Sequence, residues 1–198
     1  MSTKPLVIVI HGPSGVGKDT VIDRLRERAH IHRATSTTSR PPRHYEEDGV
    51  HYHFVTEDEF QHKIDAGDFI EYARVYDQWK GVERREIEDS LSHGQDVIIR
   101  TDVQGARTWR EKLEGAVFVF LMAEDREALR DRLLNRGSED EGSLAIRLAE
   151  FEAELADMNN NDYVVVNRHG RLEDAIDELV GIIEKERANE DRPASRLR

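Results

Sequence analysis

Short runs of apolar residues alternate along the chain with stretches in which apolar residues recur at helical spacing. The runs are Leu6–Ile10, Asp96–Ile99, Ala116–Met122 and Tyr163–Val166. The amphipathic stretches are Lys18–Arg28, Gly105–Leu113, Asp125–Leu134, Ser143–Met158 and Leu172–Glu186. Continuous apolar runs are typical of strands buried on both faces, and their alternation with helices predicts a parallel sheet with crossover helices. The pattern therefore predicts an α/β fold.

Residues 35–94 interrupt this alternation. Their pattern predicts strands at Tyr52–Val55 and Phe69–Val75, a helix that Thr56 and Glu59 open with a capping box, and a helix over Glu83–Ser92. We therefore expect an inserted lobe of mixed α+β structure over residues 36–94, between core segments 1–35 and 95–188.

Two further segments lack apolar periodicity. The first, Arg136–Gly142, is short, charged and flanked by glycines, which suits a mobile loop between two helices. The second, 189–198, is polar and contains Pro193, and we expect it to fray.

Charge and composition exclude several classes of function. The 198 residues include 29 basic and 41 acidic side chains, and the net charge of −12 argues against nucleic acid or an anionic membrane as partner. Without cysteine there is no disulfide, no thiol nucleophile and no cysteine-based zinc site. No apolar run approaches the ~20 residues of a membrane span and no secretory signal is evident, so we expect a cytoplasmic protein.

The strongest chemical signal is the sequence GPSGVGK, which follows the first apolar run and opens the first helix. It comprises Gly12, Pro13, Ser14, Gly15, Val16, Gly17 and Lys18. Glycines in this context let backbone N–H groups converge on phosphate oxygens, the helix N-terminus adds partial positive charge, and Lys18 supplies an ammonium group. We therefore expect the loop to bind the phosphates of ATP.

One position departs from this phosphate-loop pattern, which has Ser or Thr after the lysine to ligate Mg²⁺. Here Asp19 follows Lys18, and Thr20 comes next. Either side chain offers a hard oxygen ligand, so the sequence leaves both Asp19 and Thr20 as candidates for the magnesium site.

A second anion site is predicted at Arg40 and Arg43. Two prolines stiffen the backbone between these arginines, which suits a clamp for phosphate or carboxylate. The alternative for the pair alone is a solvated basic loop.

At this point the chain resembles a known family. The segments STTSRPPRHYEEDG with YHFV, GDFIEYARVY at 67–76 and DVQGA at 102–106 are similar to those of guanylate kinase, a P-loop nucleoside monophosphate kinase. The resemblance runs from about Leu6 to about Arg187. It implies a five-stranded parallel core flanked by helices, a GMP-binding lobe and, within the core, a lid over residues 136–147. It also implies Mg²⁺-dependent transfer of the γ-phosphate of ATP to GMP or dGMP, by a monomer or homodimer.

The resemblance also implies roles for individual residues. Arg40, Arg43 and Tyr52 would bind the GMP phosphate, helped by Lys80, which stands where the family usually has tyrosine. Ser36, Glu71 and Asp102 would face the guanine. Residues Gly12–Thr20 would hold the ATP phosphates, with Asn167 near the adenine. Arg136 and Arg147 would be catalytic lid arginines beside Lys18, with Arg132 a weaker third.

The chemistry of Glu71 agrees with this assignment. An ionised carboxylate only accepts hydrogen bonds, so it can pair with guanine N1–H and the N2 amine together, whereas adenine would present a lone pair to it. Asp102 has an alternative role, because an aspartate before a helix is also a common N-cap.

Some departures from the family leave two other functions open. Polar or acidic residues that are common in the guanylate kinase family are replaced here by Val82, Arg100 and the Arg168–His169 pair. Asp19 also occurs in the related ribose 1,5-bisphosphate phosphokinases, although Arg40, Arg43, Tyr52 and Glu71 together argue against that substrate. A non-catalytic guanylate-kinase-like module that binds phosphopeptides is the other alternative, against which the intact glycine loop argues.

Overall fold

The computed structural model describes residues 4–75, 77–125, 127–130 and 154–198. Its larger sheet has five strands, all paired in parallel, in the order β10-β9-β1-β7-β2. They are β1 (Val7–His11), β2 (His32–Arg33), β7 (Val97–Arg100), β9 (Val117–Ala123) and β10 (Tyr163–Asn167). The expected α/β fold with a parallel core sheet is therefore confirmed.

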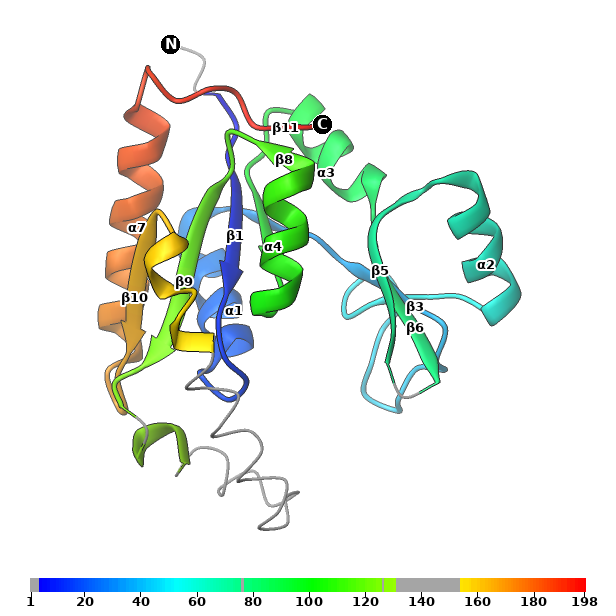
Figure 1. Cartoon of the computed structure of the whole chain (residues 1–198), viewed down its shortest axis with the longest axis horizontal. Helices are drawn as coiled ribbons and strands as arrows, with labels where there is room; N and C mark the ends of the chain where they lie inside the picture. The colour runs from blue at the N-terminus through cyan, green and yellow to red at the C-terminus, as the bar shows by residue number, and fades with distance from the viewer. Residues whose placement is uncertain (1–3, 76, 126, 131–153) are drawn as a thin grey trace.

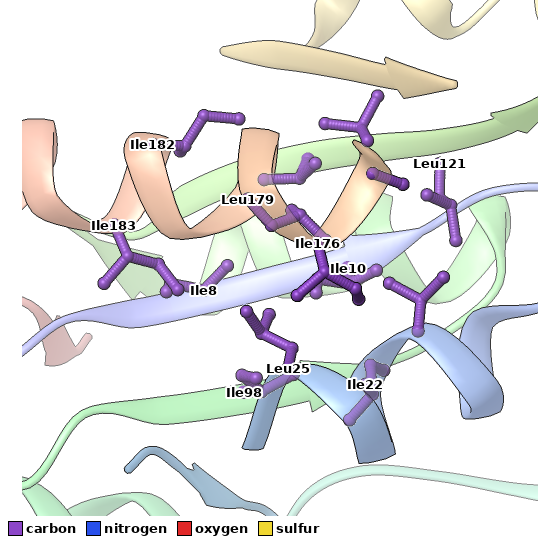
Figure 2. Close-up of a cluster of buried hydrophobic side chains, with 14 of the residues drawn as sticks. Ile8, Ile10, Ile22, Leu25, Ile98, Leu121, Ile176, Leu179, Ile182 and Ile183 are labelled. Atoms are coloured by element: carbon purple, nitrogen blue, oxygen red, sulfur yellow. The ribbon is translucent and has the colours of Figure 1, made fainter. Parts of the chain in front are cut away.

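Helices cover both faces of this sheet (Figure 1). On one side lie α1 (Lys18–Ala29) and α7 (Leu172–Ala188), and on the other lies α4 (Val103–Lys112). Because side chains alternate along a strand, Ile8 and Ile10 of β1 pack against α1 and α7 (Figure 2). Val7 and Val9 instead join the cluster that includes Trp109 of α4. Burial of each such side chain stabilises the folded state by about 1.5–3 kcal/mol. This packing holds β1 in the sheet and so determines where the glycine loop that follows it begins.

The inserted lobe is a separate mixed sheet of four strands, which projects to one side of the core (Figure 1). Its order is β4-β3-β6-β5, with β3 (Ser36–Thr38), β4 (His53–Phe54), β5 (Phe69–Val75) and β6 (Gln78–Glu83). The helix α2 (Glu57–Ala66) starts with the predicted capping box between Thr56 and Glu59. Phe60 of α2 stacks on Phe69 with ring centroids 4.3 Å apart, which holds the helix on the sheet.

Three short or polar strands, β2, β3 and β6, were not evident from the apolar pattern. The strand β6 forms an antiparallel pair with β5, and β3 pairs with β6. The helix α3 (Arg84–Ser92) follows β6, and its Ile87 packs into the cluster with Val7 and Val9. The same cluster contains Ile70 and Val82 of the lobe, so this helix packs where the lobe and the core meet.

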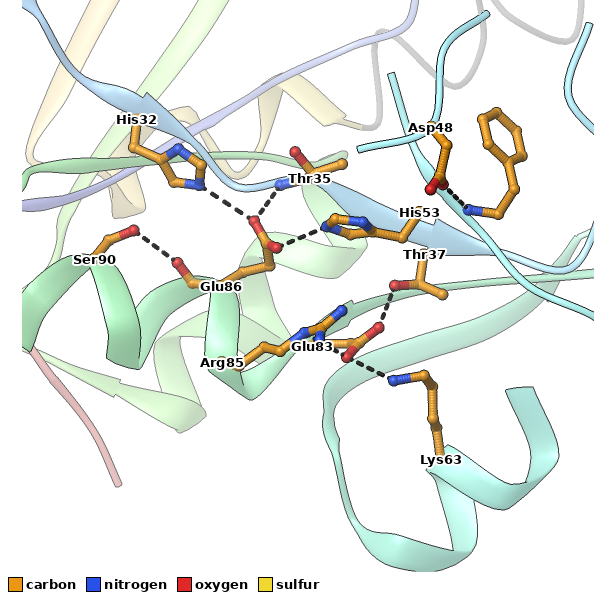
Figure 3. Close-up of polar contacts among 11 residues, drawn as sticks. His32, Thr35, Thr37, Asp48, His53, Lys63, Glu83, Arg85, Glu86 and Ser90 are labelled. Atoms are coloured by element: carbon orange, nitrogen blue, oxygen red, sulfur yellow. Dashed lines mark hydrogen bonds and ion pairs between the residues drawn. The ribbon is translucent and has the colours of Figure 1, made fainter. Parts of the chain in front are cut away.

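Two glutamates hold the root of the lobe: Glu86 joins the lobe to the core, and Glu83 ties elements of the lobe to one another (Figure 3). Glu86 of α3 accepts hydrogen bonds from Nε2 of His32 at 3.2 Å, from the N–H of Thr35 at 2.9 Å and from Nε2 of His53 at 2.8 Å. Glu83, at the end of β6, binds Thr37 and Lys63. These bonds connect the first and last strands of the lobe at the point where both leave the core.

The prediction that residues 189–198 fray is wrong. Arg196–Leu197 forms strand β11, antiparallel to β8 (Leu113–Glu114). Arg192 is buried and donates hydrogen bonds to the carbonyl oxygens of Gly115 and Lys4. The polar tail is ordered because its side chains supply donors for carbonyl groups at the end of the core, a role that an apolar pattern does not reveal.

The remaining predicted helices lie mostly outside the described residues, apart from helical turns at 127–130 and 154–155. A short 3₁₀ turn, η1 (Met158–Asn160), precedes β10. Within the described parts of the chain, no helix is long and apolar enough to cross a membrane.

Candidate nucleotide-binding site

The glycine loop leaves the carboxyl end of β1 and runs into α1. Gly12, Gly15 and Gly17 have φ angles of 142°, 86° and 92°, in the left-handed region that favours glycine. A Cβ atom on Gly12 would lie 2.1 Å from the carbonyl oxygen of Leu121, so a side chain there would also clash with β9. The sequence pattern thus corresponds to a loop whose backbone only glycine can adopt.

Lys18 lies inside this loop. Its ammonium group donates to the carbonyl oxygens of Gly12 at 2.6 Å and Pro13 at 2.9 Å. Burial, aided by the nearby charge of Arg100, lowers the pKa of Lys18 to about 8. Because the ammonium group is poorly solvated in the loop, it can readily exchange the two carbonyl oxygens that it binds for phosphate oxygens.

Asn167, at the end of β10, supports the loop. Its side-chain amide donates to the carbonyl oxygen of Val16 at 2.9 Å, and the amide nitrogen lies 2.7 Å from where a Cβ on Gly17 would be. Asn167 therefore shapes the loop directly, and the adenine contact expected for it stays a prediction.

The two candidate magnesium ligands differ in their surroundings. Oδ1 of Asp19 accepts a hydrogen bond from Arg33 at 2.9 Å and forms an ion pair with Arg100 at 3.0 Å, whereas Thr20 is exposed. Both offer hard oxygen atoms, and Mg²⁺ needs only one or two protein oxygens when phosphates and water complete its shell. The residues therefore fit a magnesium ion bound mainly through ATP, although the described residues contain no cluster of three or more His, Cys, Asp or Glu side chains suited to a metal.

The expected phosphate clamp forms one cavity of about 530 Å³. Arg40, Arg43, Tyr52 and Lys80 all line it, so the structure brings together the four residues predicted for the GMP phosphate. The cationic groups of Arg40 and Lys80 lie 5.0 Å and 5.3 Å from the centre of the Tyr52 ring. Three positive charges around one cavity suit an anionic ligand in a protein that is acidic overall.

Glu46 is a residue of this cavity that the sequence analysis missed. Its carboxylate accepts from both terminal nitrogens of Arg40 at 2.6 Å and from the backbone N–H of Arg43 at 2.8 Å. The bond from Arg40 lowers the pKa of Glu46 to about 2. Glu46 therefore holds both arginines of the clamp, and an acid three residues after Arg43 was the available sequence signal.

The residues expected to face the guanine lie where the lobe meets α4. In the lobe sheet Val82 pairs with Ser36 on one side and Glu71 on the other. Burial and the charge of Asp102 raise the pKa of Glu71. Asp102 is the N-cap of α4 and accepts from the N–H of Gly105 at 2.7 Å, so the capping role left open for it is confirmed.

The first turns of α4 also determine the surroundings of Glu71. A Cβ atom on Gly105 would lie 2.8 Å from Oε1 of Glu71, so only glycine leaves room for this carboxylate. One turn later comes Trp109, which is fully buried and whose indole nitrogen forms no hydrogen bond with the described residues. Although it completes no hydrogen bond, this N–H group lies close enough to the carboxylate of Glu71 to act against the rise in the pKa of that residue. The sequence analysis did not connect these two residues to Glu71.

The donor and acceptor regions share a cleft of about 400 Å³. Asp19 and Arg33 line it from the core, and Glu46 and Tyr52 line it from the lobe. The last two also line the phosphate-clamp cavity, so that cavity adjoins the cleft, which Asp19 lines directly after the glycine loop. The expected lid arginines Arg136 and Arg147, together with Arg132, lie outside the described residues.

Comparison with protein families agrees with this geometry. The model of the guanylate kinase family matches residues 2–186. The chain belongs to the guanylate kinase family. The matched residues include both the core and the lobe.

Three relatives illustrate the similarity. The chain is 46% identical over 187 residues to guanylate kinase 2, chloroplastic/mitochondrial, of Oryza sativa subsp. japonica, covering 93% of this chain and 66% of the rice protein. It is 38% identical over 195 residues to the guanylate kinase of Thermotoga maritima, covering 98% and 93%. The crystal structure of guanylate kinase from Anaplasma phagocytophilum has a TM-score of 0.75 at 29% identity, covering 96% of this chain and 90% of that one.

Proposed function

We propose that this protein is a guanylate kinase that transfers the γ-phosphate of ATP to GMP, and also to dGMP, yielding ADP and GDP or dGDP. The observation that carries the proposal is that the phosphate-clamp cavity shares Glu46 and Tyr52 with a cleft that Asp19, directly after the glycine loop, lines from the core. Phosphoryl transfer requires the two nucleotides to meet with their phosphates in line, and catalysis then rests mostly on positioning and charge neutralisation.

On the donor side, the loop N–H groups and Lys18 bind the triphosphate, and Asn167 keeps the loop in shape. Magnesium, held by the ATP phosphates with Asp19 or Thr20, would neutralise charge on the transferring group. On the acceptor side, Arg40, whose guanidinium is oriented by Glu46, and Arg43 offset the charge of the GMP phosphate so that its oxygen can approach the γ-phosphate.

Guanine is selected by Glu71, with Ser36 and Asp102 as further contacts. The carboxylate of Glu71 accepts from N1–H and the N2 amine of guanine, and AMP would leave it facing an acceptor. A buried polar group left without its partner costs about 1–3 kcal/mol, which is about 5- to 150-fold in selectivity. Arg136 and Arg147 would close over the phosphates from the lid.

The deciding experiment measures ADP release with GMP, dGMP, AMP, UMP, CMP and ribose 1,5-bisphosphate, each with and without Mg²⁺. We expect turnover with GMP and dGMP only, and only with Mg²⁺. The variant Glu71→Gln should lose GMP turnover selectively, because its amide presents a donor to guanine. Turnover of ribose 1,5-bisphosphate alone would favour that kinase instead, and failure to bind ATP would favour a non-catalytic module.

The small nucleotides ATP and GMP are the only partners that this proposal requires. The protein would act as a monomer or a homodimer. The cytoplasmic location expected from the sequence stays a prediction, and the rice relative is described as chloroplastic/mitochondrial.

A further inference from the structure

Four charged residues form an ion-pair cluster beside the glycine loop: Asp19, Asp23, Arg33 and Arg100. One oxygen of Asp19 accepts a hydrogen bond from Nη2 of Arg33 at 2.9 Å and forms an ion pair with Nε of Arg100 at 3.0 Å. The other terminal nitrogen of Arg33 donates to Asp23 at 3.0 Å. The cluster has two charges of each sign, so it is neutral as a whole.

Because of the position of Asp19, the neutrality of the ion-pair cluster affects how well the glycine loop can bind phosphates. Asp19 immediately follows Lys18 in the first turn of α1, where the helix dipole and the loop N–H groups favour a negative charge. A carboxylate there competes with the phosphates that the loop is built to hold. Two unit charges about 6 Å apart repel one another noticeably even at the dielectric of a protein surface. Without counter-charges, Asp19 would therefore weaken the binding of a triphosphate.

The two arginines reach Asp19 from different strands of the core. Arg33 ends β2 and Arg100 ends β7, so both lie at the carboxyl ends of parallel strands, where open α/β sheets bind ligands. Side-chain exposures of 28% for Arg33 and 41% for Arg100 show that both remain in contact with solvent beside the loop. Arg100 is also close enough to Lys18 to lower its pKa, which places its charge within range of the loop.

We propose that Arg33 and Arg100 are positioning residues for ATP, which neutralise Asp19 and hold its carboxylate away from the phosphate-binding loop. In this arrangement the acid after Lys18 is tolerated because its charge is already offset by the core. The carboxylate of Asp19 is therefore paired with the two arginines and does not act as the metal ligand. The inference rests on the ATP-binding half of the proposed function and does not depend on the identity of the acceptor.

The test is direct titration of the full chain with ATP by calorimetry, without Mg²⁺, without an acceptor and at low ionic strength. We expect Arg100→Gln to weaken ATP binding about tenfold, because it uncovers the charge of Asp19. Asp19→Ser should bind ATP more tightly than the unmodified protein. The double variant Asp19→Ser with Arg100→Gln, which has the original net charge, should return to within about twofold of it.

Arg26→Gln is the matched control, because Arg26 is an exposed arginine on α1 that forms no ion pair with the described residues. It removes the same charge but leaves Asp19 paired, so its ATP affinity should change less than twofold. The loss caused by Arg100→Gln should shrink at 0.5 M salt, because screening weakens exposed charges. If Arg100→Gln does not fold, Arg33→Gln provides the same comparison.

Three results would overturn the inference. Equal losses in Arg100→Gln and Arg26→Gln would show a general charge effect. Failure of Asp19→Ser to restore binding to Arg100→Gln would show a purely structural role. If Asp19→Ser weakens binding of Mg²⁺-ATP more than tenfold, the carboxylate coordinates the metal.

Normal ATP binding with no phosphorylation of GMP would contradict only the proposed function, whereas absence of ATP binding would contradict both the proposed function and this inference.

Discussion

Nε2 of His53 lies 2.8 Å from Oε1 of Glu86, a contact that ties strand β4 of the lobe to helix α3 (Figure 3). The second carboxylate oxygen of Glu86 binds His32 of the core strand β2 and the N–H of Thr35. A single carboxylate therefore connects the core, the lobe and the helix between them. Its bonds determine how firmly the lobe is held at its root.

The acid stability of the protein should depend on Glu86. Burial alone would raise its pKa, but the bonds from His32, Thr35 and His53 outweigh burial and lower it to about 2. The unfolded chain therefore takes up this proton first, and the stabilisation present above pH ~4.5 is lost as the pH falls toward about 2.

Glu86→Gln should lower the free energy of unfolding at pH 7 by about 1–3 kcal/mol, because the amide cannot accept all three bonds. It should also flatten the acid side of the stability profile, as measured by urea unfolding between pH 2.5 and 7. Glu88→Gln on the same helix, whose side chain is 53% exposed, is the control and should change little. Identical profiles for the two variants would contradict the role of Glu86.

The binding of GMP should weaken on acidification at a higher pH than an ordinary glutamate would cause. The reason is that burial and Asp102 raise the pKa of Glu71, and only the ionised form can accept both bonds from guanine. Calorimetric titration with GMP between pH 4.5 and 8 measures this.

Trp109→Phe should move that acidic limb further up the pH scale, because it removes the N–H group that acts against the rise in the pKa of Glu71. The affinity for ATP should stay the same. Trp79→Phe, in the aromatic cluster of the lobe, serves as the control. A pH profile that does not move in Trp109→Phe would mean that the indole only fills space.

ATP binding should decline as the pH rises through about 8, well below the range in which an exposed lysine loses its proton. The pKa of Lys18 is lowered to about 8 by burial and by Arg100, and the neutral amine cannot offset phosphate charge. Binding should therefore take up a proton at pH 8.5, which calorimetry in buffers of different ionisation enthalpy detects. Lys18→Arg should bind more weakly but without this alkaline decline, and a decline that persists would assign it to another group.

The C-terminal tail should contribute measurably to stability. Arg192→Met should cost about 1–3 kcal/mol in the free energy of unfolding, because it removes the buried guanidinium that donates to the carbonyl oxygens of Gly115 and Lys4 and to the hydroxyl of Ser195. Arg196→Met is the control, since its ion pair with Glu114 is exposed and should be worth less than 1 kcal/mol. Equal, small effects of both would mean that the tail is only loosely attached.

Local features of the chain were largely predictable. The order strand, glycine loop and helix at residues 6–29 depends on neighbours in the sequence, and the capping box of Thr56 and Glu59 spans four residues. The apolar runs predicted the parallel core because strands buried on both faces must be continuously apolar. By resemblance, the chain also indicated its family and the residues of the phosphate clamp, which the fold brings into one cavity.

Only the tertiary structure decided which charged groups meet. The pairings of Glu46 with Arg40, Asp19 with Arg100 and Glu86 with His53 follow no sequence period, because polar side chains are not constrained by an apolar face. The same holds for Arg192, whose polar segment looked free in the sequence but supplies donors to carbonyl groups about 80 and 190 residues away. The sequence pattern indicates which residues become buried on folding. The partners of the charged residues depend instead on which distant segments the tertiary structure brings into contact.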